Sequence, residues 1–446
     1  MSAAIDTLST SLRTALTSLP GQDQSWLAQR RNTALATFEA LGFPTVRDED
    51  WKYTNVRNIE RRTFALSESP SNAEAIRDAV TELNYDAAQV IAPLVDGFPC
   101  TGKQLDTLPP GATLLPLADA LAHPDHAATV QAHLGQVADA STDGFAAMNA
   151  TRLAEGYYLH VAAGVKIEQP ITILSIALAE QEFAANPRHL IVLEERADAH
   201  VVEHCVSVTK SAYLHNTVTE VVLRPHATLE HTKLQEESHQ AFHIATLEAH
   251  IETNAKMTSH AMSVGGAIAR YDINVHLRGE HASCVLNGLY LGSGRQHVDF
   301  HTRIHHIEPN CNSEQLYKGV LGGSARGVFN GQVHVHAHAQ KSDAQQSNHN
   351  LLLSRNAEID TKPQLEILAD DVKCSHGTTV GQIDNNMLFY LRSRGVPEVQ
   401  ARGLLTYGFA QDLVERLTIA PLAARMERIL MEALPHGDEL KTLVEE

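Results

Sequence analysis

The 446-residue sequence has few cysteines, a deficit of basic residues and no long apolar segment. Its five cysteines are widely spaced, odd in number and form no C-x-x-C motif, which excludes a disulfide framework and a closed zinc module. No apolar run approaches the roughly 20 residues of a membrane-spanning helix, so we expect no membrane association. Lys and Arg total 35 against 53 Asp and Glu. The chain lacks the clustered positive charge that binds phosphates, so nucleic acid is not an expected partner.

The remaining composition is that of a soluble globular protein. Apolar residues make up 43% and charged residues 20% of the chain, which is the usual balance for a folded domain. The length is enough for roughly two to three domains. The first twenty residues have the spacing of an amphipathic surface helix and too few basic residues for a transit peptide. Together with the isolated cysteines, which we interpret as reduced thiols, this predicts a cytoplasmic protein.

A repeat with strand periodicity dominates the middle of the chain. From about residue 157 the pattern alternates with period two, and small-residue turns recur at Ala199, Ala227, Ala255 and Ala282, at intervals of 28, 28 and 27 residues. Weaker copies occur at Ala163, Ala325 and Ala357. A fixed period with short strands predicts a β-solenoid, whereas a β-sandwich gives no such regular interval. The glycines expected at its tight corners are Gly265, Gly266, Gly279, Gly288, Gly292 and Gly294.

Helical patterns flank this repeat on both sides. The predicted regions are an N-terminal helical region (1–95), a mixed connecting region (96–150), the solenoid core (151–380) and a C-terminal helical domain (381–446). In the last region two apolar stripes have helical spacing, one formed by Leu405, Phe409, Leu413 and Leu417, the other by Leu422, Met426 and Ile429 or Leu430. They predict two or three packed helices, which are also candidates for a docking surface.

Cys374 and His376 are the first candidate site. They are two residues apart near the end of the repeat, and alternate side chains of a strand point to the same face. They would stand roughly 7 Å apart along a strand. A thiol and an imidazole are two suitable metal ligands, whereas iron and zinc sites have about four. The pair is therefore half a site, which other parts of the fold or a second chain would complete.

A second candidate is the alternating run His334, His336 and His338. On one strand the three rings would point the same way and could hold a metal. The alternative is an exposed polar face, with Val333 and Val335 turned inward. No H-E-x-x-H motif or obvious carboxylate partner accompanies the run.

Several longer motifs resemble those of the SufB/SufD family. The strongest are Gln364–Ile367, Cys374–Gly381 and Leu388–Gly395, supported by Asn287–Tyr290, Val328–Gly331 and Asn350–Ser354. The cluster Trp51–Thr54 resembles the N-terminal motif of the SufD branch, and the chain lacks the N-terminal cysteine motif common in SufB. It departs from the usual family pattern at Thr378, where alanine is common.

The resemblance implies a mostly β fold, with a right-handed parallel β-helix flanked by N- and C-terminal helical regions. It implies a non-enzymatic scaffold for building iron–sulfur clusters, paired with a SufB-like protein through the β-helix. A SufC-like ATPase would dock on the C-terminal helices. A transient cluster, or iron and sulfide, would sit at the SufB contact with His376 as the favoured residue and Cys374 beside it, and none would be bound stably by this chain alone. An isolated chain could form a homodimer. Two alternatives stay open: a solenoid metalloenzyme using the histidine run, and a purely structural partner of SufB.

Overall fold

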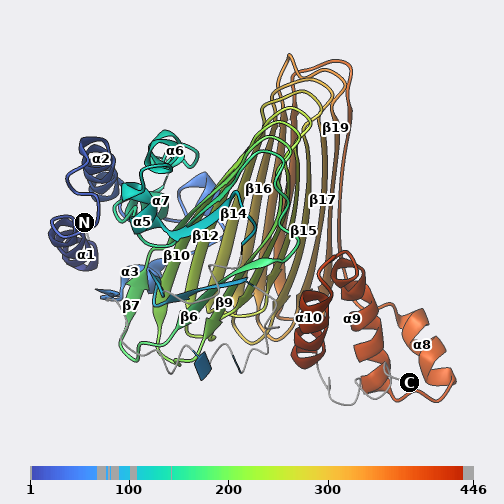
Figure 1. Ribbon diagram of the computed structural model, residues 1–446. Helices are drawn as coiled ribbons and strands as arrows, with labels where there is room; N and C mark the ends of the chain where they lie inside the picture. Colours follow the sequence, from blue (N-terminus) through green and yellow to red (C-terminus); the bar gives the residue numbers. More distant parts are fainter. Residues whose placement is uncertain are drawn as a thin grey trace.

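The computed structural model describes residues 3–67, 77–78, 81, 90–100, 108–141 and 143–434. Its centre is a parallel β-solenoid, with helices at both ends of the chain packed on its outside (Figure 1). The predicted mostly β fold with a solenoid core and helical flanks is therefore confirmed. Within the described residues, no helix combines the length and the apolar character needed to cross a membrane.

Each turn of the solenoid, here called a coil, adds one strand to each of two sheets. Sheet A runs in the order β20-β18-β16-β14-β12-β10-β8-β5-β4, and β1 and β7 join it beside β10. Its strands are β1 (Ala65–Leu66), β4 (Ala112–Pro116), β5 (Tyr157–Val161), β7 (Phe183–Ala185), β8 (Arg188–Leu193), β10 (Tyr213–Leu223), β12 (Phe242–Ile251), β14 (Ile268–Leu277), β16 (His297–His306), β18 (Arg326–Val335) and β20 (Glu358–Ile367).

Sheet B runs in the order β21-β19-β17-β15-β13-β11-β9-β6-β2-β3. Both sheets are parallel along the solenoid and finish at the N-terminal end with one antiparallel strand each, β3 and β4. The strands of sheet B are β2 (Val90–Val95), β3 (Phe98–Pro99), β6 (Ile171–Ala177), β9 (Asp198–Ser207), β11 (Thr228–Glu236), β13 (Lys256–Ser263), β15 (Ser283–Gly292), β17 (Asn312–Leu321), β19 (Asp343–Leu352) and β21 (Lys373–Gly381).

The corners from sheet A to sheet B correct the predicted repeat. Each of the six corners between β8 and β19 contains a non-glycine residue in the left-handed region followed by a small residue, and these left-handed residues are Arg196, His226, Asn254, His281, Asn310 and Lys341. The counterpart of Ala227 is thus Ala197, while Ala199 lies in β9 opposite Leu229. The interval of 28 residues from Ala199 was coincidental. Ala325 and Ala357 follow β17 and β19, so they belong to the opposite corner.

The glycine prediction is correct in part. Four of the six, Gly265, Gly266, Gly279 and Gly294, lie between strands, and Gly292 is the last residue of β15. Gly288 is in the middle of β15, where a Cβ would stand 2.2 Å from the ring of Tyr317. Close packing of an aromatic ring, and not a corner, requires glycine there.

The N-terminal helices cover the outer face of sheet A at the end where the solenoid begins (Figure 1). Apolar side chains of α1 and α2, such as Leu12 and Phe38, share one buried cluster with Ile244 and Ile268 of the sheet. The helical segments are α1 (Ala3–Ala15), α2 (Ser25–Leu41), η1 (Glu49–Trp51), α3 (Arg57–Glu60), α5 (Leu117–Ala122), α6 (Ala127–His133) and α7 (Gly144–Ala150).

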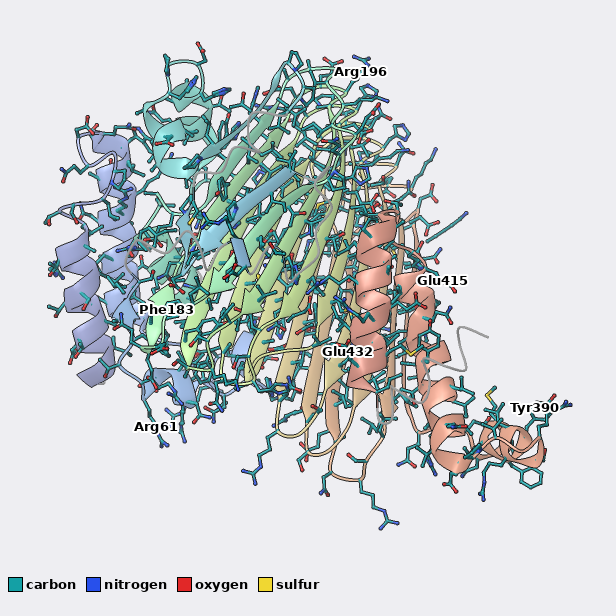
Figure 2. The ribbon with its side chains drawn as sticks, turned by 60° about the horizontal axis from the view of Figure 1, so that its bottom comes forward. Arg61, Phe183, Arg196, Tyr390, Glu415 and Glu432 are labelled. Atoms are coloured by element: carbon teal, nitrogen blue, oxygen red, sulfur yellow. The ribbon has the colours of Figure 1, made fainter. Side chains whose placement is uncertain are left out.

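Three C-terminal helices follow the last strand: α8 (Asn385–Ser393), α9 (Glu398–Val414) and α10 (Ala420–Ala433). The second predicted apolar stripe is confirmed and the first is confirmed except for Leu405, because α9 and α10 pack on the outer face of sheet B, where Leu413 and Leu430 join Leu289 and Val320. α8 instead projects away from the solenoid, and Tyr390 lies at the far end of this projection (Figure 2).

Candidate functional site

The C-terminal end of the solenoid is open. β20 and β21 are the terminal strands of their sheets and pair on one side only, with β18 and β19. Their side chains are exposed or half-buried along the whole strand, whereas all residues of β10 are buried. A free strand edge presents unpaired N–H and C=O groups that can pair with another chain. The backbone groups at this end of the core are therefore available to pair with another chain.

Cys374 and His376 both lie on β21, on this last coil. In the register of the two strands, Cys374 is opposite Ala344 and His376 is opposite Gln346. Ala344 and Gln346 are buried and point into the solenoid. Cys374 and His376 therefore share the inward face, at the rim of the last coil, and the expected one-face geometry is what the structure shows.

The two side chains have different surroundings. Cys374 is half-buried against an apolar cluster that contains Val333, Val335 and Ala344, and burial raises the pKa of its thiol. Its sulfur is therefore protonated at neutral pH until a metal ion or a nearby positive charge removes the proton. His376 is exposed. The ring is thus accessible from outside, whereas the thiol is partly covered.

Below His376 the interior is polar and incompletely hydrogen bonded. Gln346 and, one coil further in, Gln315 occupy the same inward column. Both amide atoms of buried Gln346 and the Nε2 of Gln315 have no hydrogen-bond partner. Buried polar groups are normally satisfied, so the end of the solenoid has spare donors and acceptors directly beneath the candidate pair.

A second polar network joins the two sheets at this end. The Thr378 and Thr361 hydroxyls are 3.1 Å apart, and Thr361 donates to Asn348 Oδ1 at 2.9 Å. Asn348 in turn donates to the Tyr290 hydroxyl at 3.2 Å. Thr378, the position that departs from the common pattern, therefore adds one hydrogen bond across the last coil.

The predicted histidine run does not form one face. β18 ends at Val335, so His336 and His338 lie in the following turn. The His334 and His336 rings are close, with centroids 4.3 Å apart, but His338 is 74% exposed and its Nε2 faces Glu308 at 3.4 Å. The expectation of three aligned imidazoles on a strand was wrong, because the strand stops before the second one.

Sequence reasoning missed a buried polar cluster inside the first coils. It contains two groups: Glu203 with Lys233 and His231, and Glu237 with Cys205, His215 and His243. Burial opposes the charge of His215, but the Glu237 carboxylate and the Cys205 thiol outweigh it and raise the pKa of His215 to about 10. Burial lowers the pKa of His243 to about 4. The sequence signal that could have indicated this cluster is the occurrence of polar residues at inward-facing positions of successive coils.

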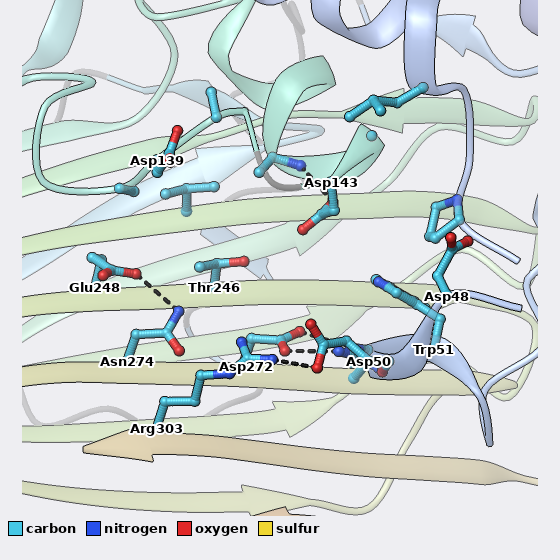
Figure 3. Close-up of a pocket in the computed structure, with 18 of the residues that line it drawn as sticks. Asp48, Asp50, Trp51, Asp139, Asp143, Thr246, Glu248, Asp272, Asn274 and Arg303 are labelled. Carbon is cyan, nitrogen blue, oxygen red and sulfur yellow. Dashed lines mark hydrogen bonds and ion pairs between the residues drawn. The ribbon is translucent and has the colours of Figure 1, made fainter. Parts of the chain in front are cut away.

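A groove of about 520 Å³ separates the N-terminal region from the outer face of sheet A (Figure 3). Across it the Arg270 guanidinium lies 3.8 Å from the centroid of the Trp51 ring, and Arg303 pairs with Asp50. Close by, Thr54 donates to Asp299 Oδ2 at 2.5 Å. The motif Trp51–Thr54 therefore holds the N-terminal region on the solenoid, which is a structural role.

Comparison with known proteins gives two family matches that together span most of the chain. Residues 9–173 match the SufBD protein N-terminal region, and residues 176–409 match the SufBD core domain of SUF system FeS cluster assembly. The chain is 34% identical to the iron–sulfur cluster assembly protein SufD of Escherichia coli over 89% of this chain and 90% of that protein.

Two further relatives support the same grouping. Identity is 29% to the SufBD family protein slr0076 of Synechocystis, over 92% of this chain and 91% of the relative. It is 26% to the assembly protein SufB of Bacillus subtilis, over 67% of this chain and 64% of that protein.

Proposed function

The chain belongs to the SufB/SufD family of iron–sulfur cluster assembly proteins, and from this membership we propose that it is a scaffold subunit of the SUF system, of the SufD type. In this role it catalyses no reaction itself and works in the cytoplasm. It holds one side of the place where a new cluster is built. The observation that carries the proposal is the open last coil, which presents Cys374 and His376 at its rim.

Pairing with a SufB-like chain would use this open end. The free edges of β20 and β21 can continue both sheets into a second solenoid by strand addition, which satisfies backbone groups along two strands at once. A partner would also cover the exposed Val380 and Ile367. When the chain is isolated, a second copy can occupy the same edges, which accounts for the expected homodimer.

The cluster is cargo at this contact. One thiol and one imidazole supply half of the usual ligand set for iron, and the partner would supply the rest. An incomplete set in each chain favours release of the product. Of the two residues, His376 is the favoured one because its ring is exposed, whereas Cys374 is half-buried among Val333 and Val335.

The C-terminal helices are proposed to dock a SufC-like ATPase. α9 and α10 are fixed to sheet B by apolar packing and by polar contacts such as Lys318 Nζ to Asp412 Oδ1, 2.7 Å. α8 is not covered by the solenoid, and its Phe389 and Met387 are 74% and 58% exposed. α9 and α10 would thus hold α8 in place on the solenoid, and the exposed apolar side chains of α8 would contact the ATPase, whose ATP cycle would move the subunits relative to one another.

The first test replaces His376 by alanine in cells that depend on this system. We expect cluster maturation to be lost while the variant still folds and still co-purifies with its SufB-like and SufC-like partners. His338→Ala is the matched control, because His338 is also an exposed histidine and lies between β18 and β19, outside the edge strands. Normal maturation with His376→Ala would remove the role of His376 and favour the purely structural alternative.

A second test separates the two docking surfaces. Val380→Glu places a charge on the open rim and is expected to abolish pairing with the SufB-like chain while leaving ATPase binding intact. Phe389→Ser on α8 is expected to do the opposite. Pull-downs with each partner separately measure this, and loss of both partners in both variants would contradict the assignment of two distinct surfaces.

A further inference from the structure

The buried cluster in the first coils has the composition of a metal site, and its position has no part in the proposed assembly contact. We propose that Cys205, His215 and His243 bind a single borderline-soft metal ion, with Zn²⁺ as the best match, inside the solenoid. These residues supply three of the about four ligands of zinc, and a water molecule from an adjoining small cavity would be the fourth. The bound ion would be a structural one, enclosed by the coils.

The first argument is geometry. Cys205 extends from β9, His215 from β10 and His243 from β12, so three strands of two sheets converge on one point inside adjacent coils. One ligand atom of each residue lies within 4.8 Å of the others. All three residues are buried, with exposed fractions of 2%, 5% and 2%. Among the residues that the structure describes, this is the only group of three potential ligands this close together.

The second argument is the orientation of the rings. The Glu237 carboxylate lies beside both imidazoles: Oε1 is hydrogen bonded to His215 Nδ1 at 3.0 Å, and Oε2 is 2.6 Å from His243 Nδ1, an ion-pair distance without hydrogen-bond geometry. A carboxylate behind a histidine fixes its tautomer and directs the other nitrogen to a metal. Glu237 is hydrogen bonded in this way to His215, and its negative charge also lies beside His243, where it favours a bound cation.

The third argument is an unsatisfied nitrogen. Both ring nitrogens of His243 are buried without a hydrogen-bond partner, and Nδ1 lies beside Glu237 Oε2. An unpaired buried polar atom loses its hydration without compensation. A metal ion bound to Nε2 removes this deficit, because the lone pair becomes a coordinate bond while Nδ1 continues to face Glu237.

The available space fits one ion after a small contraction. Zinc lies about 2.3 Å from sulfur and about 2.1 Å from nitrogen, so its ligand atoms stand closer together than 4.8 Å and the side chains have to approach by about 1 Å. Small cavities of about 10 Å³ adjoin the cluster on two sides, one lined by His215 and Glu237, the other by His243 and Ser263. Thiolate with imidazole favours zinc over magnesium or calcium.

The proposed metal site and the open end are far apart. Cys205 is on β9 and His376 is on β21, which are six steps apart in sheet B (β9, β11, β13, β15, β17, β19, β21). At about 4.8 Å per step, the separation is about 29 Å. One ion cannot serve both positions, so the two sites are independent and their tests can fail separately.

The test uses cobalt as a visible substitute for zinc. The full chain is produced in cells grown with added Co²⁺, purified without chelator, and its metal content and absorption spectrum are measured. We expect about one Co²⁺ per chain, with thiolate-to-cobalt charge transfer and tetrahedral d–d bands, because a buried site is filled as the chain folds. Absence of bound metal and of these bands in the wild-type chain would overturn the proposal.

Variants locate the ion. Cys205→Ser and, independently, His243→Gln are expected to abolish the charge-transfer band or the bound metal, and Glu237→Gln to weaken retention by about 10- to 100-fold against a chelator. Cys284→Ser is the matched control, because Cys284 is an equally buried interior thiol outside the group, and the variant should retain the band. If Cys205→Ser does not fold, His243→Gln decides the question alone.

The double variant Cys374→Ser, His376→Ala excludes the open end as the source of the signal. It should keep both the band and the bound ion. A band that survives Cys205→Ser or His243→Gln but disappears in this double variant would place the metal at the rim and refute the internal site.

Discussion

The two ends of the solenoid are built from the same coil but differ in what covers them. At the N-terminal end, the fully buried Glu220 carboxylate accepts from the backbone N–H of Gly135, Val137 and Ala138 and pairs with Arg188. At the C-terminal end, buried Gln346 has no partner for either amide atom. One end is closed by antiparallel strands and helices, and the other stops at a bare pair of strands.

The difference shows which end is complete within a single chain. A free pair of parallel edges invites edge-to-edge association unless something covers it. At the closed end the N-terminal region covers Glu220 and donates to it, whereas the open end has a half-buried thiol and exposed Val380. A partner chain at these edges, as proposed above, would complete this end.

Matched replacement of one lysine at each end gives the largest expected difference in stability. Lys233 is buried and its Nζ lies 2.8 Å from Glu203 Oε2, whereas the ion pair of Lys362 with Glu49 is exposed. Lys233→Met leaves a buried carboxylate without its cation and is expected to lower the free energy of unfolding by about 3–5 kcal/mol. Lys362→Met should change it by about 0–1 kcal/mol.

Urea denaturation of both variants and the wild type at neutral pH measures this difference. The slopes of the transitions should be similar, so that a shift in midpoint reports stability. Equal losses in the two variants would mean that the interior cluster is hydrated and that burial does not distinguish the two ends.

Mild acid should destabilise the closed interior. Burial lowers the pKa of His189 and of His306 to about 4. Below about pH 6.5 these histidines are protonated in the unfolded chain but still neutral in the folded chain. The free energy of unfolding therefore falls as the pH drops from about 6.5 to about 4, by up to about 3 kcal/mol for each histidine. Denaturation midpoints between about pH 6.5 and about pH 4.5 test this, because above that range the raised pKa of His215 acts in the opposite direction. His189→Asn and His306→Asn should each flatten the curve, and unchanged curves would contradict the assignment.

Sequence reasoning identified what depends on local pattern. Alternation and turn residues are enough for the solenoid, and helical spacing is enough for the buried faces of α9 and α10, such as Leu413 and Leu430. The shared face of Cys374 and His376 follows from strand geometry alone. These features need only the residues within one strand or one helix.

What could not be predicted depends on register between coils. Cys205, His215 and His243 lie on three different strands, and only the stacking of coils brings them together. The phase of the repeat was misread because alanine occurs both at corners and inside strands. The true marker is a left-handed residue whose type varies, for example Arg196 and His281. No local rule identifies such a position when it is not glycine or asparagine.

The smallest expected effects come from adding one methyl group in the buried interior and one at the open end. A Cβ at Gly319 would stand 2.2 Å from the ring of Tyr290, whereas a Cβ at Gly377 on β21 would meet no atom within 4 Å. Gly319→Ala overpacks the interior and is expected to lower stability by about 1–3 kcal/mol. Gly377→Ala is expected to be neutral or to stabilise by up to about 1 kcal/mol, because it restricts the unfolded chain.

The same glycine substitution also tests whether the open end is covered in the assembled state. Thermal denaturation of the isolated chain measures the intrinsic effect of Gly377→Ala, and co-purification with the SufB-like partner measures its effect on pairing. A variant that is as stable as the wild type but pairs poorly would show that the space above Gly377 is filled by the partner. A variant that pairs normally would place the contact elsewhere on β20 and β21, because a closely packed interface does not accommodate an added methyl group.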